Sequence, residues 1–204
     1  MRFYDKLVLP RLLDLVMRNN RLGTYRHAAI SAARGRVLEI GVGSGVNLPI
    51  YGPEVDQVYG IDPSPELLHR ANKRIADAQV SVSLVRASAE QLPFSDAAFE
   101  TLVMTWTLCS IPNPSTALGE MRRVLKSGGR LLFVEHGLSN EVRIIRWQHR
   151  LTPCWKRIGG RMPSRPKMDE LIRAAGFRID ALEADYMPGP KPWTFMYQGT
   201  ATPD

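Results

Sequence analysis

A short apolar run that passes directly into a glycine-rich turn limits the folds open to this chain. Residues 37–40 read VLEI, and residues 41–45 read GVGSG. Glycines allow the backbone of such a turn to approach a ligand closely, and backbone N–H groups at a helix start attract anions. The third glycine of a dinucleotide fingerprint would stand at position 46, which is Val46 here. The spacing therefore disfavours a dinucleotide oxidoreductase.

Apolar runs of strand length alternate with helical segments from residue 36 onward. Ser64-Pro65 and Asn113-Pro114 are typical helix starts, and Gly128-Gly129 is expected to end the second of these helices. The alternation predicts an α/β fold, a single Rossmann-like domain with a doubly wound, seven-stranded, mainly parallel sheet. Ligands bind such a sheet at the carboxyl ends of its strands. The expected strands are 36–40, 57–61, 80–85, 99–104, 130–135, 177–182 and 194–199.

Two helical segments are expected outside this alternation. Residues 1–30 form a predicted N-terminal arm before the main domain at 31–204, because apolar and basic residues alternate at helical spacing between positions 4 and 18. A helical lid is predicted at about 138–166, followed by a helix at 168–175. The arm could lie on an anionic membrane or cover the mouth of the domain's own site, and both interpretations stay open.

The charge balance indicates an anionic partner without identifying it. The net charge is +7 and the isoelectric point is about 9.7, which suits nucleic acid, acidic lipid or an acidic metabolite. Cys109 and Cys154, the two cysteines, lack metal-ligand spacing. We therefore expect no metal and a cytoplasmic location, with peripheral membrane contact as an open alternative. No run predicts a transmembrane helix or a signal peptide.

Two acids stand where a nucleoside ligand would need them. Glu39 lies two residues before Gly41, and Asp62 follows the second expected strand, 21 positions after Gly41. A carboxylate at the end of the second strand of such a sheet can accept both hydroxyls of a ribose. An acid beside the glycine turn suits a ligand that carries an ammonium and a sulfonium group.

The order and spacing of these motifs resemble the class I S-adenosylmethionine-dependent methyltransferases, from about residue 36 to residue 177. Residues 39–45 look like the family's first motif, Asp62 like its ribose-binding acid, residues 87–94 (ASAEQLPF) like the segment around adenine, and residues 121–129 (MRRVLKSGG) like the helix and turn before the fifth strand. The resemblance implies S-adenosyl-L-methionine as cofactor and methyl transfer as activity. It implies a set of cofactor-binding residues, in which Ser88 stands where many relatives have an Asp: Glu39, Gly41, Gly43, Gly45, Asp62, Pro63, Ser88, Ala89, Glu90 and Trp106.

Within that family the chain looks most similar to small methyltransferases of thiols, phospholipids and quinone precursors. The likeness is in residues 106–111 (WTLCSI), 134–136 (VEH) and 147–155 (WQHRLTPCW). It implies a small-molecule acceptor, with a thiol favoured and phosphatidylethanolamine or a quinone precursor as alternatives. A nucleic-acid methyltransferase is disfavoured, because no Asn/Asp-Pro-Pro-Tyr motif follows the fourth expected strand. A cofactor-binding sensor or scaffold without turnover is the alternative from another class.

Methyl transfer needs alignment and exclusion of water, and it needs a base only when the acceptor starts protonated. His136, at the end of the fifth expected strand, is the first candidate base. His149, beside Trp147 on the expected lid, is the second. Trp106 is a candidate cation–π partner for a sulfonium, whereas Cys109 is not expected to act as a nucleophile. A packing role is an open alternative for each of these side chains.

Overall fold

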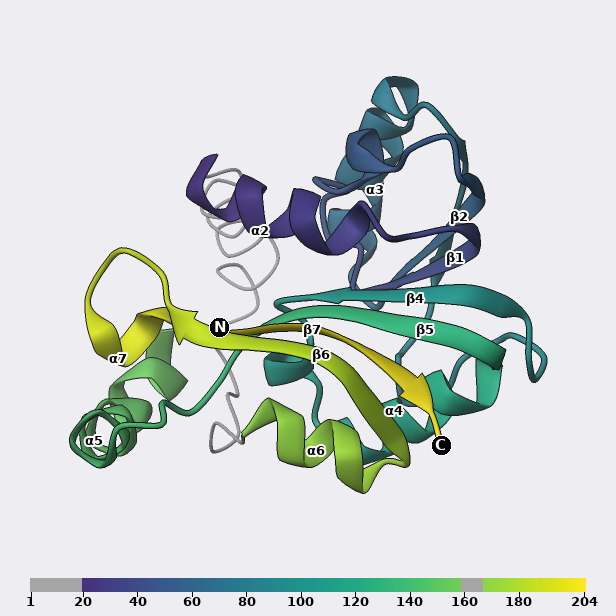
Figure 1. The fold of residues 1–204 in the computed structure, drawn as a ribbon. Coiled ribbons are helices and arrows are strands. Elements are labelled where there is room, and N and C mark those ends of the chain that lie inside the picture. The colour runs from purple at the N-terminus through teal and green to yellow at the C-terminus, as the bar shows by residue number, and fades with distance from the viewer. Residues whose placement is uncertain (1–19, 159–166) are drawn as a thin grey trace.

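The computed structural model describes residues 20–158 and 167–204, which form a central sheet with helices on both faces (Figure 1). The seven strands are β1 Gly35–Ile40, β2 Val55–Asp62, β3 Ser81–Arg86, β4 Phe99–Thr105, β5 Leu125–His136, β6 Phe177–Tyr186 and β7 Phe195–Pro203. Their order is β3-β2-β1-β4-β5-β7-β6, with β1–β5 parallel and β7 antiparallel to both of its neighbours. This confirms the predicted seven-stranded, mainly parallel, Rossmann-like sheet.

Helices cover the two faces of the sheet in pairs. In Figure 1, α2 (Asn20–Ile30) and α3 (Pro65–Arg74) lie on one side, and α4 (Pro114–Val124) and α6 (Met168–Ala174) lie on the other. The helices α5 (Val142–Ile158) and α7 (Lys191–Thr194) pack together beyond one end of the sheet. The described residues also contain three short 3-10 helices: η2 (Leu48–Ile50), η3 (Ile75–Asp77) and η4 (Leu108–Ser110).

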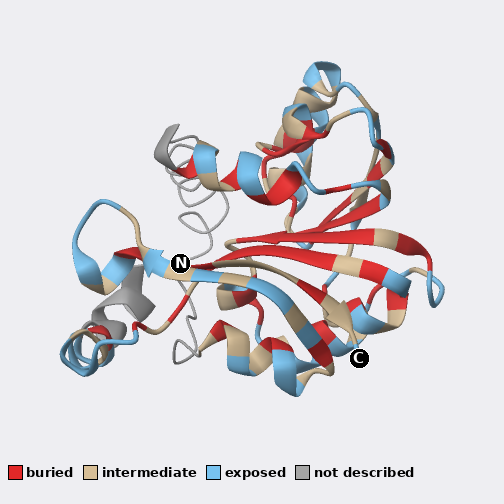
Figure 2. Ribbon diagram, viewed as in Figure 1, coloured by how far each residue is buried: buried red, intermediate tan, exposed pale blue. Residues whose placement is uncertain are grey.

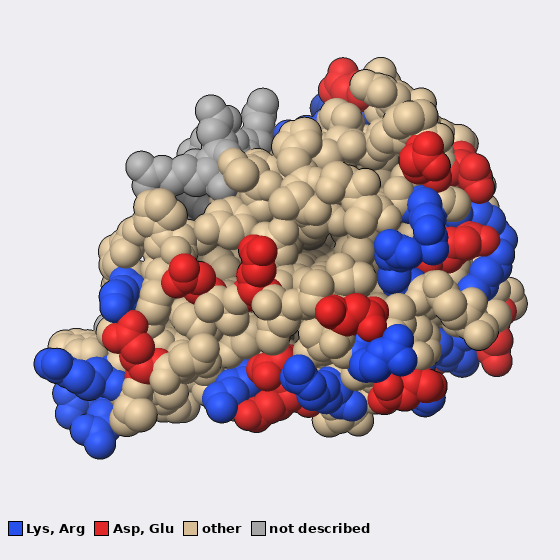
Figure 3. All heavy atoms as spheres, in the orientation of Figure 1, with Lys and Arg blue, Asp and Glu red and all other residues tan. Residues whose placement is uncertain are grey.

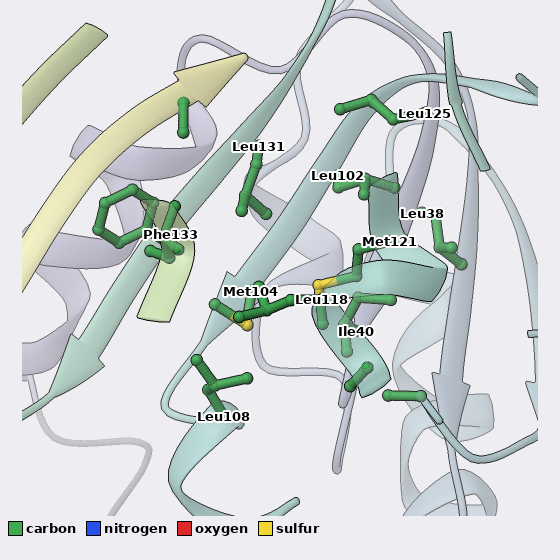
Figure 4. Close-up of a cluster of buried hydrophobic side chains, with 14 of the residues drawn as sticks. Leu38, Ile40, Leu102, Met104, Leu108, Leu118, Met121, Leu125, Leu131 and Phe133 are labelled. Carbon is green, nitrogen blue, oxygen red and sulfur yellow. The ribbon is translucent and has the colours of Figure 1, made fainter. Parts of the chain in front are cut away.

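Alternate residues of the central strands point into two separate cores, as period-2 geometry requires. Leu102 and Leu131 belong to the core under α4 and α6, whereas their neighbours Val103 and Leu132 belong to the core under α3. Figure 2 shows β4 and β5 buried along most of their length, and Figure 4 shows the first core between the strands and α4. Burial on both faces explains why these strands read as continuous apolar runs.

One expected helix end is wrong. The helix after Asn113 ends at Val124, and Gly128 and Gly129 lie inside β5 rather than before it. The chain enters the strand early because Leu125 already pairs with Phe99, and the ladder then shifts register before the next pair. The double glycine therefore sits in an irregular first part of β5. It is not a helix stop.

The flanking segments can be compared with the structure only in part. The expected arm helix between residues 4 and 18 lies outside the described residues, as does the 159–166 part of the expected lid. Of the arm, α2 is described, and it packs on β4, β5 and β7. Of the expected lid, the structure describes the helix α5 at 142–158, and its role as a lid stays a prediction. No helix among the described residues is long and apolar enough to cross a bilayer.

Candidate active site

The glycine turn lies at the carboxyl end of β1 with its backbone in the left-handed region. Gly41 has φ +69 and Gly43 has φ +55, conformations that favour glycine. A Cβ atom on Gly41 would lie 2.4 Å from the Thr107 side chain, and one on Gly45 would lie 2.9 Å from the Cα of Ala71. A Cβ on Gly43 would meet nothing nearer than the Gly41 carbonyl oxygen at 3.9 Å. Gly43 thus leaves room for a ligand against bare backbone.

Asp62 ends β2 and ties the glycine turn to the start of α3. Its Oδ2 accepts a hydrogen bond from the Gly43 N–H at 3.1 Å, and its Oδ1 accepts one from the Ser64 N–H at 2.8 Å. Burial raises the pKa of Asp62, and the two backbone hydrogen bonds oppose that rise. A carboxylate has about four acceptor positions, so Asp62 can receive ribose hydroxyls while it holds the turn. The carbonyl of Pro63, the next residue, accepts from Arg86 Nε at 3.4 Å.

Glu39 is buried beneath the turn with two hydrogen-bond donors of its own. It is 1% exposed and accepts hydrogen bonds from Asn47 Nδ2 and from the Tyr51 hydroxyl, both at 2.8 Å. Asn47 Nδ2 also lies 3.0 Å from the Thr105 hydroxyl at the end of β4. Burial raises the pKa of Glu39 to about 7, although both donors and the charge of Arg26 oppose the rise. Glu39 therefore couples the first motif to the end of β4 through Asn47.

The segment after β3 forms a small turn of its own. Ser88 Oγ accepts the Glu90 N–H at 3.2 Å and lies 3.3 Å from Glu90 Oε2. Glu90 Oε1 in turn accepts from both the backbone N–H and the side-chain amide of Asn113, at 3.0 and 2.8 Å. Ala89 is buried, whereas Ser88 is exposed. The Ser88 hydroxyl is therefore accessible to a ligand at the carboxyl edge. The Asn113 side chain stabilises this turn and makes no capping hydrogen bond to α4.

Trp106 and Arg26 form a stacked pair at the end of β4. Trp106 has φ +51, which is unusual for a residue with a Cβ atom. The Cζ of Arg26, on α2, lies 4.8 Å from the Trp106 ring centroid. Arg26 is 2% exposed, and its Nη2 has no hydrogen-bond partner among the described residues. Since a guanidinium already covers one face of the indole, a sulfonium would have to use the other.

Glu135 holds the loop that carries Trp106. Its Oε1 accepts the backbone N–H groups of Thr107 at 2.7 Å and Leu108 at 2.9 Å, which start η4. The side chain is fully buried, and burial raises the pKa of Glu135 to about 7 against these backbone hydrogen bonds. Its Oε2 lacks a hydrogen-bond partner within the described part of the chain. The carboxyl group thus fixes the loop after β4 through Oε1, and Oε2 is left as a buried oxygen that could bond to a ligand.

His136 closes β5 beside an apolar wall. Its ring centroid lies 6.4 Å from that of Trp106. In the sheet it pairs with Met196, which packs with Val134, Trp106 and Met187 in one cluster. An acceptor next to His136 would therefore meet apolar side chains.

His149, the second candidate base, and Cys109, which was not expected to act as a nucleophile, lie in α5 and η4 rather than at the strand ends. His149 is exposed on α5, so the structure does not bring it into the group formed by Asp62, Trp106 and His136. Cys109 is partly buried in η4, and its Sγ donates to the Trp106 carbonyl oxygen at 4.0 Å. The carboxyl ends of parallel strands β1, β2, β4 and β5 thus gather most of the predicted site residues at one edge.

Comparison with known proteins agrees with this arrangement. A family model described as "Methyltransferase domain" matches residues 38–133. The chain is 38% identical to a phosphatidylethanolamine N-methyltransferase of Cereibacter sphaeroides over 111 residues, 53% of this chain and 54% of that protein. It is 30% identical to the thiol S-methyltransferase TMT1B of Homo sapiens over 171 residues, 80% of this chain and 68% of that one. The chain thus spans only about half the length of the bacterial relative.

A solved structure shows the same fold. A putative methyltransferase of Bacillus halodurans superposes with a TM-score of 0.70 at 20% identity, covering 90% of this chain and 96% of that one. Fold and relatives together define a Rossmann-like transferase domain. The chain belongs to the class I S-adenosylmethionine-dependent methyltransferases, and its cofactor is S-adenosyl-L-methionine.

The residues present fit this cofactor. Gly43 leaves space for a ligand against the backbone, and Asp62 has acceptor capacity left for a ribose. Buried polar atoms without partners in the described chain include Arg26 Nη2, Asn47 Oδ1 and Trp106 Nε1. Buried polar groups are normally hydrogen-bonded, so these atoms suit a ligand with charged and polar groups. These two donors and one acceptor therefore suit a nucleoside that carries an amino-acid tail.

Several residues of this site were missed by sequence reasoning. Asn47 and Tyr51 follow the glycine turn closely, but their spacing does not predict that both donate hydrogen bonds to Glu39. Arg26 lies in a helix that carries no motif. Glu135 did leave a signal, because an acid inside an apolar strand of a buried sheet needs a partner.

Proposed function

We propose that this methyltransferase acts on a small apolar acceptor and that the acceptor is a thiol. The observation that carries the proposal is the apolar surrounding of His136, where the partly buried side chains of Trp106 and Met187 pack on the buried Val134 and Met196. Apolar walls favour an acceptor with little polar surface. The similarity to the thiol S-methyltransferase TMT1B supports the same chemistry.

The chain's own residues would divide the work between binding and proton transfer. When bound, S-adenosylmethionine supplies a methyl group activated by its sulfonium. Gly43 and Asp62 would hold the nucleoside, and Ser88, Ala89 and Glu90 would flank the base. The Arg26 guanidinium, buried and with a free Nη2, would receive the carboxylate of the amino-acid tail.

A thiol acceptor must lose its proton, because the thiolate is the nucleophile. His136 is the proposed base, since it ends β5 beside the apolar cluster and an imidazole titrates near neutral pH. The proton would pass from the thiol sulfur to the imidazole. Trp106 and the loop held by Glu135 would form the wall that excludes water.

A phospholipid amine is the second candidate acceptor, favoured by the 38% identity to a phosphatidylethanolamine N-methyltransferase. An amine must also lose a proton, so His136 would serve the same role. A quinone precursor stays a third alternative. We also propose a cytoplasmic location, on the basis of the two cysteines, which are far apart in sequence and lack metal-ligand spacing.

The acceptor can be tested by methyl transfer from labelled S-adenosylmethionine to butanethiol, hydrogen sulfide, phosphatidylethanolamine in mixed micelles, and butanol as the oxygen counterpart of butanethiol. Methylation of butanethiol without methylation of butanol would support the thiol proposal. Turnover of phosphatidylethanolamine alone would overturn it in favour of the lipid acceptor. Cofactor binding without turnover of any acceptor would indicate a sensor or scaffold.

The base can be tested with a pair of thiols of different acidity. His136→Gln should lower turnover of butanethiol at neutral pH by about 100-fold, because the variant cannot remove the proton. It should leave turnover of thiophenol, which is already largely ionised, nearly unchanged. His27→Gln, an exposed histidine on α2, is the matched control. Equal losses on both thiols would contradict a role as base, and a loss in His149→Gln instead would assign that role to His149.

A further inference from the structure

The large apolar side chains that the described residues expose all lie on two neighbouring helices. Val142 is 64% exposed and Trp147 54% exposed on α5, and Trp193 is 38% exposed on α7. The two helices pack against each other. Isolated surface hydrophobics are normal, but a tryptophan pair with a valine on one helix pair marks an interaction surface.

Basic side chains share this surface. Arg143, Arg146 and Arg150 are exposed on α5, and they fall on the same side of the helix as Val142 and Trp147 at three- and four-residue spacing. The sequence of α5, from residue 142 to 158, contains no Asp or Glu. Figure 3 shows Lys and Arg side chains gathered at the end of the molecule that α5 forms. We call the exposed face made by these three arginines, Val142, Trp147 and Trp193 the α5–α7 face.

The α5–α7 face is attached firmly to the active-site edge. Gln148, which is 3% exposed, donates from Nε2 to the carbonyl oxygens of Gly137 at 3.1 Å and Pro192 at 3.3 Å. Its Oε1 accepts the Ser139 N–H at 3.0 Å. A salt bridge of 2.8 Å joins Lys191 of α7 to Glu141, the residue before α5. One buried amide therefore connects α5, α7 and the residues that follow His136.

We propose that the α5–α7 face docks this enzyme on the surface of an anionic lipid bilayer. Tryptophan rings prefer the interface between headgroups and acyl chains, and arginines at the same level pair with lipid phosphates. A helix with apolar and basic residues and no acid has the composition of a membrane-surface helix. The exposed indoles distinguish this face from a purely electrostatic surface for nucleic acid, for which arginines alone would suffice. The inference goes beyond the proposed function, because it does not depend on which acceptor is methylated.

The test is co-sedimentation of the full chain with vesicles of phosphatidylcholine alone and of phosphatidylcholine with phosphatidylglycerol. We expect binding only to the anionic vesicles, weakened by added salt. Charge reversal at Arg143, Arg146 and Arg150 to Glu should weaken this binding by at least about 30-fold. Trp147→Ala with Trp193→Ala should weaken it while leaving the net charge unchanged. A matched control reverses the same number of exposed charges elsewhere: Arg34→Glu, Lys73→Glu and Arg122→Glu.

Each outcome of the sedimentation either supports or overturns docking through the α5–α7 face. Cofactor binding in each variant shows that the fold is intact, so lost sedimentation with retained cofactor binding supports the proposal. If the α5 variant and the matched control lost vesicle binding equally, the effect would depend on net charge alone and the proposal would be overturned. Vesicle binding that persists in the α5 variant would locate the membrane contact elsewhere in the chain. If the chain bound duplex DNA more tightly than vesicles at equal ionic strength, the partner of the α5–α7 face would be nucleic acid and the membrane proposal would be wrong.

Discussion

The guanidinium of Arg26 stacks on the indole of Trp106, with 4.8 Å between Cζ and the ring centroid, and joins α2 to the loop after β4. Burial lowers the pKa of Arg26 to about 10, so it stays charged at neutral pH, and the nearby Glu39 opposes the drop. Within the described chain its Nη2 has no partner. A buried cation with a free donor at the cofactor edge predicts an anion in the bound state.

Arg26→Met should therefore weaken binding of S-adenosylmethionine by about 10- to 100-fold, the worth of one charged hydrogen bond. Binding of 5′-methylthioadenosine, which lacks the carboxylate, should change little. Calorimetry with both ligands measures the difference, and Arg34→Met, at an exposed arginine, is the control. If both ligands lost affinity equally, Arg26 would be a packing residue rather than the carboxylate partner.

Glu39 should make folding stability fall as the pH rises from about 4.5 to about 7. Its pKa is raised from 4.5 to about 7 by burial, so the folded chain binds more protons than the unfolded chain between these values. The stability from this group is fully present below about pH 4.5 and is lost as the pH rises toward 7. Glu39→Gln cannot titrate and should gain up to about 3 kcal/mol relative to the wild type between pH 5 and pH 8. Urea unfolding across that range measures the gap, and a constant gap would contradict the raised pKa.

Two glycines of the turn should respond differently to the same substitution. Gly43→Ala places a methyl group in open space, so it should cost only about 1 kcal/mol of backbone strain while weakening cofactor binding strongly. Gly41→Ala places that methyl 2.4 Å from the Thr107 side chain and should destabilise the fold itself by more. Thermal unfolding and cofactor titration of both variants separate the two effects. Full cofactor affinity in Gly43→Ala would show that no ligand approaches the turn there.

Glu135 should stabilise the loop after β4 through the two backbone N–H groups that it accepts. Glu135→Ala leaves the amides of Thr107 and Leu108 without their acceptor, which should cost about 2–4 kcal/mol. Glu135→Gln keeps one oxygen in place and should recover most of that loss. Chemical unfolding near pH 6 compares the three chains. Equal stability of the Ala and Gln variants would show that the amides find other partners.

Much of the fold was predictable because the strands are buried on both faces. The apolar runs predicted all seven strands, and the predicted strand ends differ from those in the structure by a few residues. The double glycine at 128–129 misled the prediction of a helix end, because a helix stop and an irregular strand use the same residues. What decides between them is the pairing of Leu125 with Phe99, a contact across the sheet that local sequence does not encode.

The candidate site was also predictable where its residues are close in sequence and not where they meet through packing. Glu39, Asp62 and the glycine turn were predicted because strand, turn and acid are close in sequence and the family motif includes them. Arg26 was not, because its position over Trp106 depends on how α2 packs on the finished sheet. The exposure of His149 on α5 was likewise not predictable. Its helical pattern is compatible with contact with an acceptor and with an exposed surface, and packing decides between the two.

The central claim is that Asp62 and the glycine turn form the nucleoside site, and calorimetric titration of S-adenosylmethionine tests it most directly. The wild type should bind at micromolar concentration, and Asp62→Ala should lose at least about tenfold in affinity, because it removes the acceptor for the ribose and for the Gly43 N–H. Asp56→Ala, an exposed acid at the start of the same strand, should bind as the wild type does. A folded Asp62→Ala variant with unchanged affinity would contradict the assignment of the site.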